Sequence, residues 1–553
     1  MSEYLYFFIA LIPIAGLILA LGVFKAPAHW ATPLVLGLTA LLAVLVWAFP
    51  LPLLGTAVLE GAAFALWPIM LVILAALFTY NLAEKSGSLN TIKRMLTGIT
   101  EDKRIQVLIL AWGFGGFLES VAGYGTAVAI PASILAALGF NPLFAAALSL
   151  IANTVPTAFG AVGIPVSTLA TITELPVAPL SLAVGLQLTP FILLIPFVLV
   201  ILTGGGFKAM KGMFWITLAS GLAFAIPQLA AAAFLGAELP AILGSLTSMT
   251  VTIFIAKAMG RKKGAATGGG LSQTVAGTDP ALSPVEVGSV PGLSPVQPGS
   301  VPAPSPIDLK SVPVSFKEGF LAWLPYILVF VFVLMASPLI PPIKDFLSHF
   351  KSLVPIYMGD GAKPLEFKWI ATPGVLIILA TFLGGLIQGV KPVVILSVLG
   401  KTAGQLVKST ITVISILALA KVMGYSGMIA NLAAVFVAIT GPLFPLFSPL
   451  IGALGTFVTG SDTSSNILFG KLQTTVAEGI HQSPTWLAAA NTAGATAGKM
   501  ISPQSIAVAT AAIGQTGQEG NILLRTLPYC LAYVLLVGFM VWILGPLAAV
   551  YFP

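Results

Sequence analysis

The chain has 553 residues, of which 58% are hydrophobic and only 8% are charged, and its mean hydropathy is +1.03. A soluble domain carries about 25% charged residues, so this composition excludes an ordinary soluble protein. The formal net charge of +7 is what the basic loops of a membrane protein produce, and it does not indicate nucleic-acid binding.

Long apolar stretches recur along the whole chain. Each is long enough to cross ~30 Å of hydrocarbon as a helix. None shows the alternation of apolar and polar residues that is typical of the strands of a membrane β-barrel. We therefore predict an all-α polytopic membrane protein with roughly 12–14 membrane segments. The first stretch, Leu5 to Phe24, follows Glu3 and lacks a small-residue cleavage site, so we expect a retained span rather than a signal peptide.

Metal and disulfide chemistry have little support in the composition. The single cysteine, Cys530, lies in an apolar run, and the three histidines are scattered along the chain. We therefore expect no disulfide, no zinc site and no cofactor.

Basic residues gather in the loops that follow alternate crossings, at 85–104, 208–211, 257–263 and 391–408. The positive-inside tendency places these loops in the cytoplasm. The connections near 50–56 and 236–240 lack Lys and Arg, so we expect them outside together with the N-terminus and the mixed segment 341–368. Lys421, near the outer end of its span, is expected to extend its ammonium to the membrane surface.

The composition changes to Gly, Pro, Ser and Val between 261 and 317, where ALSPVEVGSVP (281–291) is followed by GLSPVQPGSVP (292–302). Such a segment cannot build a packed core, so we interpret it as a cytoplasmic linker. A binding role for its proline-rich repeats is the alternative. The linker separates a first half, 1–260, with an extra helical hairpin at 213–258, from a second half, 318–553.

The two halves resemble each other at a nearly constant offset. GSDTSSNI (460–467) aligns with GYGTAVAI (123–130), NTAGATAGKMISPQS (491–505) with NTVPTAFGAVGIPVS (153–167), and Ser426-Gly427 with Ser86-Gly87. The span ending at Glu84 should run inward and its counterpart ending near Gly424 outward. We therefore predict two inverted repeats whose broken helices or re-entrant segments meet at the bilayer midplane.

The aligned stretches have the composition of interrupted helices. They contain Gly113, Gly115, Gly116, Gly123, Gly125 and Gly460, with Pro156, Pro165 and Pro503. Broken backbone at membrane depth survives where it is buried or lines a wet cavity, and freed N–H groups favour an anion. The predicted substrate-binding residues are Lys499, Ser461, Thr463, Ser464, Ser465, Asn153, Thr154, Asn491, Thr492, Tyr124, Gly123 and Gly125. The alternative is that such small polar residues only pack and cap helices.

Three ionisable residues, Glu119, Asp462 and Lys499, lie in these stretches, far from any basic loop. A central charge costs ~2.5 kcal/mol or more on insertion scales, so such residues usually face the bundle interior and serve transport. Lys499 is expected to hold a substrate carboxylate or Asp462, while Glu119 and Asp462 are the predicted proton-coupling pair. A mutually neutralising structural network is the alternative.

These residues resemble the L-lactate permease family. The resemblance is densest in WPIMLVILAALFTY (67–80), FGGFLESVAGYGTAVAI (114–130), NTVPTAFGAVGIPVS (153–167), TGSDTSSNILFG (459–470) and AANTAGATAGKMISPQSIAVA (489–509). It implies uptake of L-lactate, often also D-lactate and glycolate, with protons, and it places the glutamate, aspartate and lysine of the family pattern on Glu119, Asp462 and Lys499. Tyr124 and Thr126 depart from the family's phenylalanine and alanine and add hydroxyls.

We therefore predict proton symport of a small 2-hydroxy monocarboxylate across the cell membrane of a prokaryote. The bilayer and the substrate are the expected partners, and a homo-oligomer is compatible with the sequence. Sodium coupling, with Asp462 and freed carbonyls as ligands, is the alternative within this class, and a channel is the next. Because HExxH, a P-loop and a histidine beside the polar stretches are all lacking, we predict neither an enzyme nor ATP-driven transport.

Overall fold

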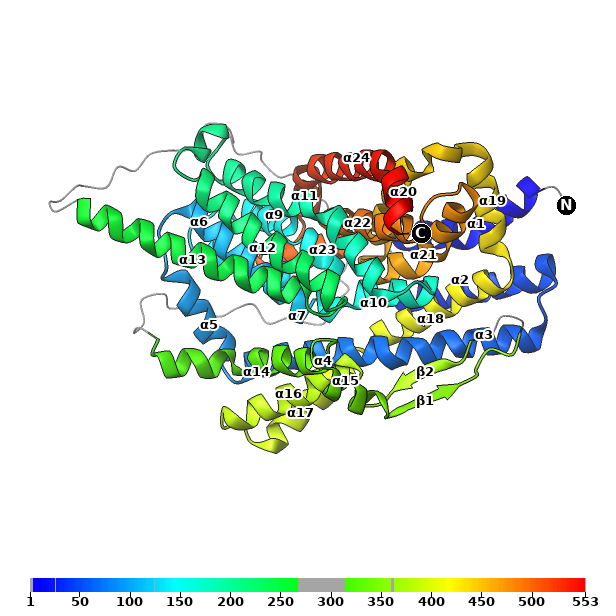
Figure 1. The fold of residues 1–553 in the computed structure, drawn as a ribbon, viewed down its shortest axis with the longest axis horizontal. Coiled ribbons are helices and arrows are strands. Elements are labelled where there is room, and N and C mark those ends of the chain that lie inside the picture. Colours follow the sequence, from blue (N-terminus) through cyan, green and yellow to red (C-terminus); the bar gives the residue numbers. More distant parts are fainter. Residues whose placement is uncertain (1–2, 25, 124, 267–313, 360–362, 553) are drawn as a thin grey trace, which may run out of the picture.

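The computed structural model describes residues 3–24, 26–123, 125–266, 314–359 and 363–552. Within these ranges, 12 helices are long and apolar enough to cross a membrane, and most of them run along the long axis of the molecule (Figure 1). The predicted all-α polytopic class is confirmed. Most of the predicted linker, including its tandem repeat, lies outside the described residues.

A flanking layer is built from the first helices of each half, and α3, α4, α14, α16 and α17 lie along the lower part of Figure 1. Gly87 and Gly427 take left-handed φ angles of 77° and 91° at the start of α5 and α19, which explains why both halves share a Ser-Gly pair there. The helices are α1 (Glu3–Leu17), α2 (Ala28–Trp47), α3 (Leu51–Phe64), α4 (Leu71–Lys85) and α5 (Ser88–Thr97), then α14 (Phe316–Met335), α15 (Pro341–Ser348), α16 (Pro373–Ile387), α17 (Pro392–Gln405), α18 (Val407–Tyr425) and α19 (Met428–Thr440).

A central bundle contains the rest of each half. Asn141, Ser461, Ser483 and Ser502 cap α9, α21, α22 and α23 by accepting a backbone N–H. The helices are α6 (Lys103–Val107), α7 (Gly115–Val121), α8 (Thr126–Ala137), α9 (Pro142–Ala152), α10 (Gly160–Thr173), α11 (Val177–Thr203), α12 (Phe214–Phe234) and α13 (Pro240–Ala266), then α20 (Phe444–Thr459), α21 (Asp462–Gly479), α22 (Pro484–Ile501), α23 (Pro503–Ala512) and α24 (Glu519–Tyr551).

Helices of the two halves pack on one another in matching pairs. In the flanking layer α1 packs on α19 as α14 packs on α5, and α2 packs on α18 as α16 packs on α4. In the central bundle α8 packs on α23 as α10 packs on α21, and α9 packs on α24 as α22 packs on α11. The connectors α5 and α19 lie at opposite ends of the molecule (Figure 1). Two related halves would make such reciprocal contacts; the inverted repeat itself stays a prediction.

One small sheet interrupts the helical fold. Strands β1 (Lys351–Val354) and β2 (Leu365–Lys368) pair antiparallel, with Lys351 opposite Lys368 and Val354 opposite Leu365. These strands could not be predicted from the sequence, because four-residue segments show too little alternation to be recognised. Trp369, just after β2, packs its ring on Trp67, which ties this hairpin to the flanking layer.

The glycines of the first polar stretch serve helix packing rather than chain breaks. Gly113 lies inside the continuous helix Lys103–Val121, and a Cβ there would come within 2.8 Å of the Met249 Cβ on α13. A Cβ at Gly116 would come within 3.2 Å of both Phe224 on α12 and Pro156. The predicted break at these glycines is therefore wrong, and the chain turns only at Gly123 and Gly125.

Lys421 does not reach for the membrane surface, in contrast to the prediction. Its Nζ lies 2.6 Å from Oε1 of Glu60 on α3, and the Tyr425 hydroxyl donates to Glu60 Oε2 at 2.9 Å. Glu60 is only 5% exposed. Because its partner belongs to the other half of the chain, no local pattern in the sequence could reveal this pair.

We expect Lys421→Met to lower the free energy of unfolding by ~3–5 kcal/mol, because Glu60 would remain as a buried, uncompensated charge. Adding Glu60→Met should restore much of the loss. The measurement is the apparent Tm of the purified protein in detergent, with Lys401→Met on the exposed face of α17 as the control. Equal destabilisation by the single and double variants would show that the two charges are not coupled.

Candidate functional site

Four helices of the described chain begin around one cavity in the central bundle. These are α8 and α10 from the first half and α21 and α23 from the second. Each helix N-terminus presents free N–H groups and carries roughly half a positive charge. The cavity is therefore surrounded by fixed dipoles that attract an anion.

The backbone at these helix starts takes conformations that need small residues. Gly125 and Gly460 have φ angles of 81° and 74°. Before α10 becomes regular, Ala161, Val162 and Gly163 all lie in the left-handed region, where non-glycine residues are strained. A Cβ at Gly163 would overlap the carbonyl oxygen of Ala237 in the loop between α12 and α13. This loop therefore holds the strained turn in place from outside the aligned stretches.

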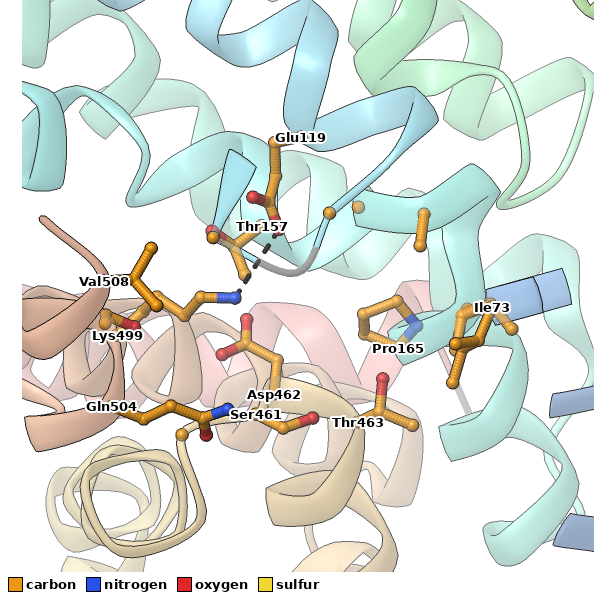
Figure 2. A pocket seen from close by; sticks show the side chains of 17 residues that line it. Ile73, Glu119, Thr157, Pro165, Ser461, Asp462, Thr463, Lys499, Gln504 and Val508 are labelled. Atoms are coloured by element: carbon orange, nitrogen blue, oxygen red, sulfur yellow. Dashed lines mark ion pairs between the residues drawn. The ribbon is translucent and has the colours of Figure 1, made fainter. Parts of the chain in front are cut away.

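A buried ionic network occupies one side of the cavity (Figure 2). Lys499 on α22 places its Nζ 3.6 Å from Oε1 of Glu119 on α7. Asp462, in the first turn of α21, lies beside them, and its Oδ1 accepts from the Thr456 hydroxyl at 3.2 Å. The three residues are between 2% and 8% exposed. Two carboxylates and one ammonium are therefore buried together, with the Glu119 carboxylate at ion-pair distance from the ammonium.

Glu119 is held in position by its neighbours. Asn153 Nδ2 donates to Glu119 Oε2 at 3.1 Å and to the Thr157 hydroxyl at 3.3 Å. Gly160 leaves the space that the carboxylate fills, because a Cβ there would come within 2.8 Å of Glu119 Oε1. Asp462 is less constrained: its Oδ2 is buried without a hydrogen-bond partner among the described residues. A buried carboxylate oxygen of this kind is available to a proton, a water or a ligand.

The cavity has a volume of about 100 Å³. One water needs roughly 10–15 Å³ on this measure, so the space suits a solute of a few heavy atoms. Besides the ionic network, the polar wall contains Thr157, Ser461, Thr463, Gln504 and Ser505. The apolar lining residues are Ile73, Ala161, Ile164, Pro165 and Val508. In Figure 2, Ile73 and Pro165 lie on the side opposite Lys499, whereas Val508 lies beside Lys499. Within the described ranges, no three His, Cys, Asp or Glu side chains gather as they would around a metal ion.

Seven of the predicted site residues line this cavity. They come from the polar stretches 114–130, 459–470 and 489–509, and Figure 2 shows several of them pointing into the cavity. The seven are Glu119, Gly123, Gly125, Ser461, Asp462, Thr463 and Lys499. Tyr124 lies outside the described residues.

The other predicted residues make contacts away from the cavity wall. Asn491 and Thr492 both donate to Asn466 Oδ1, at 2.9 and 3.0 Å. Ser465 donates to the Gly452 carbonyl and Thr154 to the Leu150 carbonyl. Ser464 uses its N–H to bond the Ser461 cap, and Asn153 reaches the site only through Glu119.

Several cavity residues were not anticipated. Thr157 and Gln504 lay inside aligned stretches, but nothing in their spacing distinguished them from packing residues. Ile73 gave no signal at all, because an isoleucine in an apolar span is the expected residue. The Gln504 side chain lies directly over Gly460, where a Cβ would overlap its amide oxygen.

Comparison with known proteins gives one consistent family. A family model described as L-lactate permease matches residues 6–548. An L-lactate permease of Streptococcus iniae is 49% identical over 481 residues, covering 87% of this chain and 93% of the relative. A glycolate permease of Escherichia coli is 35% identical over 551 residues, covering 96% and 94%.

Among solved structures, the YdaH transporter of Alcanivorax borkumensis is similar, with 15% identity and a TM-score of 0.48 over 93% of this chain and 98% of that one. The sequence relationship is much closer, because the family model spans nearly the whole chain and a relative shares almost half of the aligned residues. This multi-pass membrane protein therefore belongs to the L-lactate permease family.

Proposed function

We propose that the chain is a secondary transporter that imports L-lactate and related small 2-hydroxy monocarboxylates, including D-lactate and glycolate, by symport with protons. The observation that carries this proposal is a lysine and two carboxylates buried together at a small cavity where four helices begin. The relatives named L-lactate permease and glycolate permease support the substrate class. The cell membrane of a prokaryote, with the N-terminus outside, is the proposed location.

The walls of the cavity suit the three parts of such a substrate. Its carboxylate would lie at Lys499, where a charge-assisted hydrogen bond and the helix N-termini favour an anion. Its hydroxyl would meet Ser461, Thr463 or Gln504, which offer both donors and acceptors. Its carbon chain would rest on the apolar wall.

Proton coupling follows from counting charges in the site. With both carboxylates ionised, Lys499, Glu119 and Asp462 sum to one negative charge, and a carboxylate substrate would add another at short range. Like charges in a water-poor site repel strongly. A proton on Glu119 neutralises its carboxylate and so breaks its ion pair with Lys499. The ammonium can then pair with the substrate instead. The substrate and the proton would then cross together, and the charge of the site would change little.

Purified protein in proteoliposomes should accumulate L-lactate when the outside is made acidic, because the proton gradient supplies the driving force. The measurement is uptake of labelled L-lactate at fixed membrane potential, with and without a proton ionophore. Unlabelled glycolate should compete with the label, and liposomes without protein are the control. Stimulation by sodium at constant pH would contradict proton coupling, and failure to transport any 2-hydroxy acid would contradict the substrate class.

Lys499→Ala should raise the KM for L-lactate by about 30-fold or more, because removing one member of a buried charge pair costs about 2–5 kcal/mol. Lys401→Ala, on the exposed face of α17, is the matched control and should leave uptake unchanged. Size-exclusion profiles of both variants establish that they are folded. Normal uptake by the Lys499 variant would remove this lysine from the substrate site.

Glu119→Gln should keep exchange of labelled for unlabelled L-lactate but lose accumulation driven by a pH gradient, because the amide mimics a permanently protonated carboxyl. The control is Glu174→Gln at the end of α10, where the hydrogen bond from Lys363 lowers the pKa of an exposed carboxylate. That control should accumulate L-lactate normally. Full accumulation by Glu119→Gln would exclude Glu119 as the proton carrier.

A further inference from the structure

One residue of the apolar wall comes from a different part of the fold from the rest of the cavity lining. Among the described residues that line the cavity, Ile73 alone belongs to the flanking layer. It lies on α4 of the flanking layer, whereas Ile164 and Pro165 lie on α10. In Figure 2 its side chain faces the cavity beside Pro165, on the side opposite Lys499.

The position of Ile73 is fixed by a break in its own span. The backbone of Trp67 leaves the helical region, with φ −134° and ψ 114°, and α4 then begins at Leu71. Ile73 therefore lies in the first turn of α4, which packs against α10. At 3% exposed, the side chain has little freedom to move away. It is therefore a packed part of the cavity wall.

We propose that Ile73, together with Pro165, sets the length of the substrate's carbon chain. This inference rests on the proposed function. A carboxylate held at Lys499 directs the rest of the molecule away from the ionic network, towards the wall that these two residues form. The small volume of the cavity then allows a short alkyl group between the polar groups and Ile73, and it excludes a longer one.

The size of the effect can be judged from other apolar pockets. One methylene more or less in a hydrophobic pocket changes the specificity ratio about 10–200-fold. Replacing isoleucine by alanine removes three carbons from the wall, enough space for a chain longer by one or two carbons. A phenylalanine would fill the space that the lactate methyl requires, while glycolate, which has no methyl, would still fit.

The test measures kcat/KM for uptake of three acids into proteoliposomes: glycolate, L-lactate and 2-hydroxybutyrate. In Ile73→Ala, the ratio for 2-hydroxybutyrate over L-lactate should rise by roughly tenfold or more. In Ile73→Phe, the ratio for glycolate over L-lactate should rise by a similar factor. Ratios within one variant are independent of how much protein is inserted, so lower stability does not imitate the result.

Leu74→Ala is the matched control, because Leu74 is the next residue on α4, is partly buried and does not line the cavity. Its ratios should equal those of the wild type. Should Ile73→Ala not purify as a folded protein, Ile73→Val replaces it, and the ratio should shift in the same direction. Wild-type uptake of L-lactate with unchanged ratios in the Ile73 variants would overturn the role of Ile73. Absence of lactate uptake by the wild type would instead overturn the proposed function.

Discussion

The ion pair between Lys499 and Glu119 is the constraint around which the central bundle is arranged. A lysine at membrane depth costs ~2.5–3.5 kcal/mol on insertion scales unless it is compensated. The compensating carboxylate lies in the other half of the chain, on α7, with Nζ and Oε1 3.6 Å apart. The fold must therefore hold helices from two distant segments at one separation. Asn153 and Gly160 contribute to this directly, one by orienting Glu119 and the other by leaving it room.

Close helix packing within the second half holds Lys499 in position for this pair. Gly452 on α20 lies against the backbone of Asn491 on the neighbouring α22. On α22, a Cβ at Gly494 or Gly498 would overlap carbonyl oxygens of α20. The small residues before Lys499 thus allow two backbones to touch, as is usual where helices pack in membranes. Between the two halves, α10 packs on α21 and α8 packs on α23. All four N-termini consequently face the charges that they help to stabilise.

A site residue could be predicted from the sequence only where its own burial in the membrane is costly, whatever its neighbours are. Glu119, Asp462 and Lys499 could be assigned to one site because a charge in an apolar span is costly wherever it stands. The hydroxyl and amide side chains could not be divided in this way into cavity residues and packing residues. Asn491 and Thr492 hydrogen-bond to Asn466, whereas Thr463 lines the cavity, and the sequence shows no difference between these roles. Glu60 and Ile73 escaped notice because their significance lies entirely in partners that are distant in the sequence.

The proposed exchange of partners on Lys499 also sets the ratio of protons to substrate. One ammonium can neutralise one carboxylate at a time, so a substrate carboxylate can replace Glu119 only when Glu119 has bound a proton. A second proton, on Asp462, would leave the loaded site with no net charge, whereas with one proton it keeps a single negative charge close to four helix N-termini. Those N-termini supply the positive potential that this single charge requires. The proposed mechanism therefore uses one proton for each substrate anion, which would make transport electrically neutral.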